Sequence, residues 1–138
     1  MPFHIAPTAT RLYVGLGFSM VSFCIGIAPF SFGQFFSKLY GLQAATPSAI
    51  AYQQALGVRD VTLGLAYLLS YMGRDTRATE TLLISHGFIG FGDALVVWLN
   101  GGNLSRIPVH LGGGLLATGI GLWFRLYYEV DVLNKKTK

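Results

Sequence analysis

The chain has few charged residues: Asp, Glu, Lys and Arg make up only 12% of its 138 residues, whereas hydrophobic residues make up 52%. A soluble domain averages about 25% charged residues. A water-soluble fold of this length would therefore leave a large apolar surface with too few polar residues to cover it. We expect one integral membrane domain that occupies residues 1–138.

Cysteine is almost absent, because Cys24 is the single one in the chain. This excludes an internal disulfide and any CxxC site. Cys24 lies within an apolar run, so we expect a packed and inert thiol. The net charge is +4, but the basic residues are scattered near the ends of the apolar runs. Nucleic-acid-binding proteins gather such residues on one face, so we expect no nucleic-acid partner.

Long apolar runs dominate what is present. Each run is long enough to cross a hydrocarbon core about 30 Å thick. Backbone groups in lipid must form their hydrogen bonds within their own segment, which makes these runs helices. We therefore predict an all-α fold, a four-transmembrane-helix bundle. The predicted spans are about residues 12–32, 49–72, 78–99 and 107–130.

Local signals mark the expected ends of these helices. Thr46 is a helix cap followed by Pro47 in the first turn of the second span. Gly73 lies where that span should stop. Pro29 should kink or terminate the first span, and residues 33–45 form the longest predicted connection, which is amphipathic at best and lies at the membrane interface.

Basic residues also predict the orientation, because positive residues favour the cytoplasmic side. With four spans, both termini and the middle connection lie on the same side. That side carries seven basic residues and the opposite side carries two, Lys38 and Arg106. We expect a multi-pass protein with both termini in the cytoplasm. The seven are Arg11, Arg74, Arg77, Arg125, Lys135, Lys136 and Lys138.

Three charged residues stand deep inside the apolar runs. Arg59 and Asp60 fall at the centre of the second run, and Asp93 lies in the third. A charge at this depth costs about 2.5–3.5 kcal/mol on insertion scales, and such residues usually mark a functional site. Two acids beside one Arg leave a net negative charge, which predicts that one carboxyl holds a proton. We expect Arg59, Asp60 and Asp93 to be the catalytic residues.

Helical spacing places small or polar residues along one face of each span, and we expect these four faces to line the bundle interior around a polar pocket. Gln53 shares the face of Asp60, and His86 shares the face of Asp93. His110 begins the corresponding face of the fourth span. We expect Gln53, His86, His110 and Tyr52 to bind substrate or support the site. Tyr52 also fits an interfacial aromatic belt.

Other interpretations of these residues stay open. The three charges also fit a structural ion-pair network that fixes helix pairing. Two His and two Asp would suit a first-row metal, but no HxxxH or ExxH spacing is present, so we expect neither a metal nor another cofactor. Each His is more often a hydrogen-bonded residue of a bundle. The small-residue faces permit a homo-oligomer.

The sequence also resembles a known family. The segment GVRDVTLG at residues 57–64, the basic connection GRDTR at 73–77 and GDA at 92–94 resemble a family of small four-helix integral membrane proteins. Some fungal members accompany the polyketide pathways of the aurovertin and citreoviridin type, where they are regarded as epoxide hydrolases or epoxide-opening cyclases. The resemblance implies the same roles for Arg59, Asp60 and Asp93.

The resemblance implies a lipophilic, polyketide-like epoxide as substrate and the endoplasmic reticulum or another endomembrane as the location. Opening an epoxide needs an acid for the leaving oxygen and a base for water or an internal hydroxyl. Two carboxyls kept in different protonation states meet that need. The alternative is a non-catalytic membrane scaffold, or a small carrier or proton relay, with a structural buried ion-pair network.

Overall fold

The structure is a computed structural model that describes residues 8–42 and 46–136, with side chains up to residue 126. Its described part contains helices and no strand, so the predicted all-α class is confirmed. Four long helices follow one another. They are α1 (Thr8–Tyr40), α2 (Pro47–Met72), α3 (Thr76–Leu99) and α4 (Ile107–Lys136), with the short 3-10 helix η1 (Leu104–Arg106) before α4.

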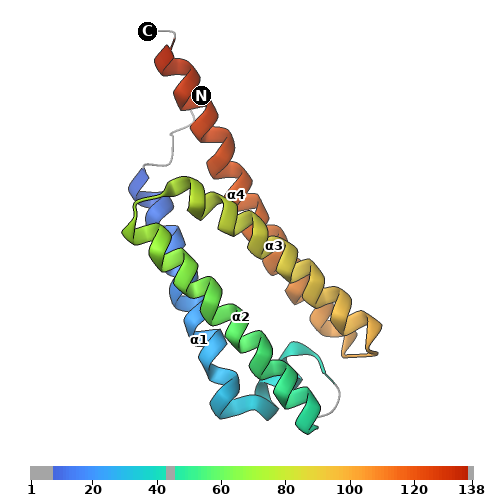
Figure 1. Cartoon of the computed structure of the whole chain (residues 1–138). Coiled ribbons are helices and arrows are strands. Elements are labelled where there is room, and N and C mark those ends of the chain that lie inside the picture. Colours follow the sequence, from blue (N-terminus) through green and yellow to red (C-terminus); the bar gives the residue numbers. More distant parts are fainter. Residues whose placement is uncertain (1–7, 43–45, 137–138) are drawn as a thin grey trace.

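The helices form two antiparallel pairs (Figure 1). α1 packs along α2 and α3 packs along α4, while contacts between the pairs are sparser. Glycines allow the close approach inside each pair. A Cβ placed on Gly26 would lie 2.7 Å from the carbonyl oxygen of Gly57, and one on Gly114 would lie 2.8 Å from that of Gly87. The last turns of α4 extend beyond the other helices (Figure 1).

α1 is longer than the predicted first span and contains a break. Phe32 has non-helical angles, φ −127° and ψ 38°, three residues after Pro29. Proline has no N–H to donate and clashes with the preceding turn, which explains a kink here. The helix resumes to Tyr40 beyond the break, so the expectation of a connection from residue 33 was wrong over most of its length. Its end bends under the bundle (Figure 1).

The predicted ends of α2 are confirmed. Thr46 Oγ1 accepts a hydrogen bond from Ala49 N at 3.2 Å, and Gly73 caps the other end. Asp75 caps α3, accepting from Ala78 N at 2.9 Å. These caps satisfy amide groups that have no partner inside their own helix. The turn between α2 and α3 is therefore short and fixed, and it joins the two pairs at one end.

Three of the helical segments are long and apolar enough to cross a membrane: Thr8–Tyr40, Thr76–Leu99 and Leu104–Leu126. α2 is the exception among the described helices. With 26 residues it is about 39 Å long, enough to span, but Gln53, Gln54, Arg59 and Asp60 lower its hydropathy. The apolar character predicted for all four spans therefore holds for three. Cys24 is exposed on α1 and is not packed, contrary to expectation.

Most of the large buried side chains lie between the pairs near the α2–α3 turn. Tyr67, Leu83 and Phe124 form a cluster that is at most 1% exposed. Beside it, Arg11 Nη1 lies 3.2 Å from Glu80 Oε1, and both residues are only 4% exposed. This ion pair joins α1 to α3. Glu80 was not recognised from the sequence, because it stands only two residues inside the predicted start of its span.

The close contact of α1 with α2 can be tested by a substitution that adds a single methyl group. We expect Gly26→Ala to lower the free energy of unfolding by about 1–3 kcal/mol, because the added Cβ meets the backbone of α2. Gly17→Ala on the same helix faces open space and should be neutral or slightly stabilising. Denaturation in mixed micelles measures both. Equal effects of the two changes would contradict the packing.

Candidate functional site

The three charged residues predicted from the sequence meet between α2 and α3. Arg59 donates from Nη1 to Asp93 Oδ1 at 2.8 Å and from Nη2 to Asp93 Oδ2 at 3.2 Å. Its Nε donates to Asp60 Oδ1 at 3.0 Å. A planar guanidinium makes such paired bonds with a carboxylate, and they are the strong kind. The ion pair joins α2 to α3 and so connects the two helix pairs.

This group of charges lies on the wall of a cavity of about 450 Å³ between the helix pairs. All four long helices contribute to the wall, which is otherwise mainly apolar. A volume of this size is typical of a site for a small ligand. The lining residues include Phe18, Ile25, Pro29, Phe36, Leu39, Leu56, Ile89, Val109 and Leu116 as apolar members, and Tyr40, Gln53, Arg59, Asp60, His86, Asp93, Arg106 and His110 as polar ones.

The cavity opens sideways. Every lining residue that is itself exposed belongs to α1 or α4, and none belongs to α2 or α3. α1 and α4 come from different pairs, and few of their residues approach each other apart from the contact of His110 with Tyr40 at one end. In a bilayer this opening would face acyl chains. The exposed lining residues are Ile25, Leu39, Val109, Gly113 and Leu116.

His110 holds the end of α1 against α4. Its Nε2 lies 2.9 Å from the carbonyl oxygen of Tyr40, and because a carbonyl only accepts, Nε2 carries the hydrogen. The two rings also contact each other, with centroids 4.8 Å apart. His110 therefore contacts Tyr40 rather than the charged residues.

His86 lines the cavity on α3. Its Nδ1 is 3.4 Å from the hydroxyl of Tyr67, and the ring of Phe18 meets it edge-on at 5.7 Å. His86 is therefore a hydrogen-bonded residue of the bundle. Within the described residues, no group of three or more His, Cys, Asp and Glu side chains is placed to hold a metal ion.

Gln53 and Tyr52 differ although they are neighbours. Gln53 lines the cavity and is 3% exposed, and its Nε2 has no hydrogen-bond partner among the described residues. Tyr52 is 37% exposed and is not part of the wall. Its ring meets that of Tyr40 edge-on at 6.3 Å. Tyr52 therefore contacts a residue of the wall, Tyr40, without lining the cavity itself.

Tyr40 and Arg106 are the polar lining residues that the sequence did not single out. Tyr40 was expected at the membrane interface, in the predicted connection. The break at Phe32 bends the chain so that Tyr40 reaches the cavity beside Asp93. Pro29 was the available signal, but it predicts a kink without giving the direction of the bend.

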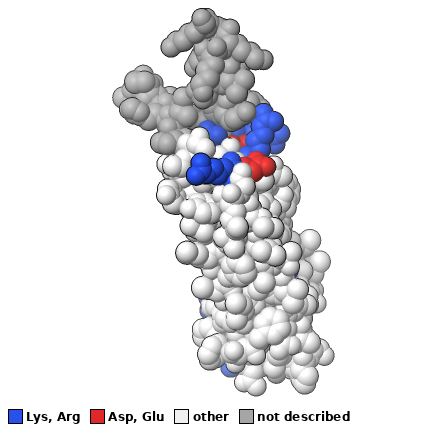
Figure 2. All heavy atoms as spheres, turned by 60° about the vertical axis from the view of Figure 1, so that its left-hand side comes forward, with Lys and Arg blue, Asp and Glu red and all other residues white. Residues whose placement is uncertain are grey.

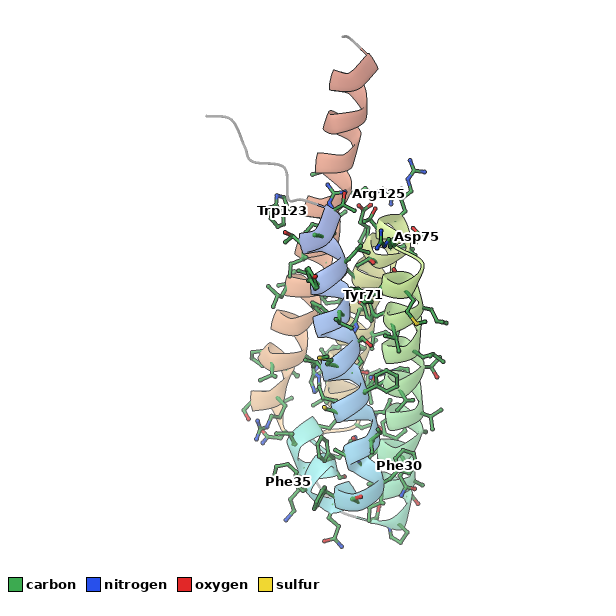
Figure 3. All side chains as sticks on the ribbon, turned by 90° about the vertical axis from the view of Figure 1, so that its left-hand side faces the viewer. Phe30, Phe35, Tyr71, Asp75, Trp123 and Arg125 are labelled. Atoms are coloured by element: carbon green, nitrogen blue, oxygen red, sulfur yellow. The ribbon has the colours of Figure 1, made fainter. Side chains whose placement is uncertain are left out.

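The two ends of the bundle differ in charge. Figure 2 shows the Lys, Arg, Asp and Glu side chains gathered at one end of this face, with a largely uncharged surface below. Asp75 and Arg125 lie at that end, and Phe30 and Phe35 lie at the other (Figure 3). Pro29, Phe36 and Leu39, which neighbour these two Phe residues in sequence, line the cavity. The cavity therefore extends into the half of the bundle away from the charged end.

One known protein family matches most of the chain. Residues 19–124 match the family described as "Domain of unknown function (DUF4267)". The chain belongs to this family. The DUF4267 region contains Arg59, Asp60, Asp93 and every cavity-lining residue except Phe18, while Arg11 lies before it. Neither a curated protein nor a solved structure matches the chain.

The ion pair predicts a measurable coupling. In a double-mutant cycle with Arg59→Met and Asp93→Asn, we expect a coupling energy of about 1–3 kcal/mol, because two charge-assisted hydrogen bonds are lost together. The cycle with Asp60→Asn should give a smaller value, since one bond joins that pair. Asp75→Asn, at the turn, is the control and should show no coupling with Arg59. Absence of coupling to Asp93 would contradict the geometry.

Proposed function

We propose that this DUF4267 protein is a membrane-embedded epoxide-opening enzyme that acts on a lipophilic, polyketide-like substrate by Asp/Arg/Asp acid–base catalysis. The observation that carries the proposal is the Arg59 guanidinium bound by two carboxylates on the wall of an apolar cavity. An apolar substrate dissolves in the bilayer and reaches these polar groups through the opening between α1 and α4.

The hydrogen bonds differ between the two carboxyl groups and favour a different catalytic role for each. Both oxygens of Asp93 accept from Arg59, which favours its ionised form and the role of base. Asp60 accepts one bond from Arg59 and keeps its second oxygen free, so it is the acid. Asp93 takes a proton from water as the water oxygen attacks an epoxide carbon. The carbon–oxygen bond breaks, Asp60 gives its proton to the epoxide oxygen, and a vicinal diol results.

The same machinery also serves cyclisation, in which an internal hydroxyl of the substrate replaces water. Asp93 then takes the proton of that hydroxyl, and a cyclic ether forms as Asp60 protonates the epoxide oxygen. Afterwards Asp93 holds a proton and Asp60 has none. Arg59 contacts both carboxyls, so it stabilises whichever one is charged while the protons are exchanged with water.

For the topology, we propose that α2 crosses the membrane with the other three helices. Its polar groups are shielded inside the bundle: Gln53 is buried, and Arg59 pairs with both Asp60 and Asp93. The start of α1 and the turn between α2 and α3 then lie at the charged end. The distribution of basic residues favours the cytoplasm for that side, so we propose that both termini are cytoplasmic. We propose the endoplasmic reticulum or another endomembrane as the location.

A second candidate function is a non-catalytic membrane scaffold or small carrier, including a proton relay. The observation that favours it is the position of the ion pair. Arg59 and Asp93 join two helix pairs that otherwise touch sparsely, which is what a structural connection would do. Turnover measurements separate the two functions. Loss of a purely structural ion pair destabilises the fold, whereas loss of a catalytic residue lowers the rate of product formation in a protein that stays folded.

The catalytic proposal predicts product from a polyene epoxide. Purified protein in lipid nanodiscs should convert it in ¹⁸O-labelled water to a diol carrying one labelled oxygen, or to an unlabelled cyclic ether, as detected by mass spectrometry. We expect Asp60→Asn and Asp93→Asn to lower the rate by about 10²–10⁴-fold, the usual contribution of an acid or base. Asp75→Asn removes an acid at the α2–α3 turn and should leave the rate unchanged.

The folded state of each variant is checked by its thermal unfolding. Folded Asp60→Asn and Asp93→Asn proteins that form product at the original rate would end the catalytic proposal. No product with any epoxide, together with unfolding of both variants, would favour the structural function.

The proposed topology makes a separate prediction. In a Cys24→Ser background, Lys38→Cys and Arg74→Cys place single thiols before and after α2. If α2 crosses the membrane, a membrane-impermeant maleimide added to sealed vesicles should label one of them at once and the other only after permeabilisation. Labelling of both from the same face would show that α2 does not span.

A further inference from the structure

Arg106 is a cation on the cavity wall that pairs with no acid among the described residues. It is the last residue of η1 and directly precedes α4. Its Nε is buried and has no hydrogen-bond partner within the described part of the chain. The two acids of the wall, Asp60 and Asp93, both pair with Arg59 instead. A charge removed from water needs hydrogen bonds and an opposite charge to compensate for the lost hydration.

The end of α1 fixes the position of Arg106. A Cβ placed on Gly41 would lie 3.1 Å from the Cβ of Arg106, so the stem of this side chain packs against the chain there. The backbone N of Asn103 donates to the carbonyl oxygen of Gly41 at 2.7 Å, and the carbonyl oxygen of Asn103 accepts from Arg106 N at 2.9 Å. Backbone hydrogen bonds thus attach the segment that carries Arg106 to α1, which makes its guanidinium a pre-organised cation.

Gln53 provides a second donor at the same end of the cavity. Its Nε2 also lacks a partner within the described residues, and Gln53 as a whole is only 3% exposed. The ring of Tyr52, its neighbour in sequence, meets the ring of Tyr40, and Gly41, which follows Tyr40, contacts Arg106. Gln53 and Arg106 therefore both line the part of the cavity that borders the end of α1.

The charges on the wall indicate an anionic ligand group. In the proposed mechanism Asp60 holds a proton, so Arg59 and Asp93 neutralise each other and the positive charge of Arg106 has no counterpart. The Tyr40 hydroxyl adds no free donor for an uncharged group, because the carboxylate of Asp93 lies within hydrogen-bonding reach of it. A carboxylate supplies the one missing negative charge, and its two oxygens can accept from a guanidinium and from an amide N–H.

We propose that Arg106 and Gln53 form a subsite for the carboxylate of a lipophilic acid, whose apolar chain lies along the cavity towards the opening between α1 and α4. Asp60 follows Gln53 by seven residues on α2, which corresponds to roughly 10 Å along the helix. This inference rests on the proposed function, because it takes the cavity to be a substrate site. It narrows the substrate class to lipophilic epoxides with an acidic end, in which the epoxide lies about that distance from the carboxylate.

Binding tests the subsite without any reaction. The full chain in nanodiscs of zwitterionic phosphatidylcholine is photolabelled with a diazirine derivative of hexadecanoic acid, at an alkaline pH at which the acid is ionised. Hexadecanoate and methyl hexadecanoate are added as competitors. The ester keeps the chain and both oxygens but has no charge. We expect the acid to compete about tenfold to hundredfold better, because hydrogen bonds to charged groups are stronger than neutral ones.

The variants locate the effect. Arg106→Met should remove most of the preference for the acid, whereas Arg106→Lys should keep part of it, because lysine retains the charge without the planar fork of donors. Gln53→Leu should reduce the preference by about threefold. Lys38→Met removes an exposed cation near the end of α1 that does not line the cavity, and should leave the preference unchanged. Competition by the methyl ester should be the same in every variant, which shows that the cavity is intact.

Equal competition by acid and ester in the original protein would overturn the proposal. An equal loss of preference in Lys38→Met and Arg106→Met would also overturn it, because the surface charge of the bundle would then attract the acid. Dihexadecanoyl phosphatidylglycerol is a third competitor. If it competes as well as hexadecanoate, the site binds lipid head groups, and the proposed acid is wrong.

The competitors contain no epoxide, so their binding does not depend on catalysis. Selective binding of the acid without turnover of any epoxide would contradict the proposed function and leave the subsite standing.

Discussion

A charged group inside an apolar helix is stable only where another part of the same protein neutralises it, and the Arg59 guanidinium does this for two carboxylates at once. Asp60 is adjacent in sequence, but Asp93 comes from the next helix. Satisfying Asp93 therefore fixes the face that α2 turns towards α3. Once that face is fixed, Gln53 and Gly57, at helical spacing from Asp60, also point inward and are buried.

The architecture follows from two kinds of contact that act at different places. Within each helix pair, glycines let the two backbones approach closely, because they have no side chain that would separate them. Ion pairs act between the pairs: Arg59 with Asp93 joins α2 to α3, and Arg11 with Glu80 joins α1 to α3. Neither ion pair holds α1 to α4 on the side of the cavity. That side is where the exposed lining residues lie, so the lateral opening is a consequence of where the strong contacts are absent.

Much of this arrangement was predictable from the sequence. Run lengths, the Thr46 cap and Gly73 gave the helices, and the spacing of Gln53, Asp60 and Asp93 brought the polar residues together. What failed depended on tertiary geometry. The break after Pro29 placed Tyr40 in the cavity. The low hydropathy of α2 is different, because its polar residues can be read from the sequence, and only their burial depends on the neighbouring helices.

The cavity bears on whether the ion pair has a purely structural role. A connection between helices is strongest when the surrounding side chains pack closely, because unfilled volume forfeits van der Waals contacts. Here the opposite arrangement occurs: Gly57, Gly90, Gly113 and Gly114 line a volume of about 450 Å³ directly beside the charged residues. Three of these glycines also bring the helices of a pair close together, so their small size serves packing on one side. Gly113 has open space around it and makes no such contact, and a larger apolar residue there would cover part of the cavity. The volume left next to Arg59 is thus not required by the helix contacts, which favours a ligand as the reason for it.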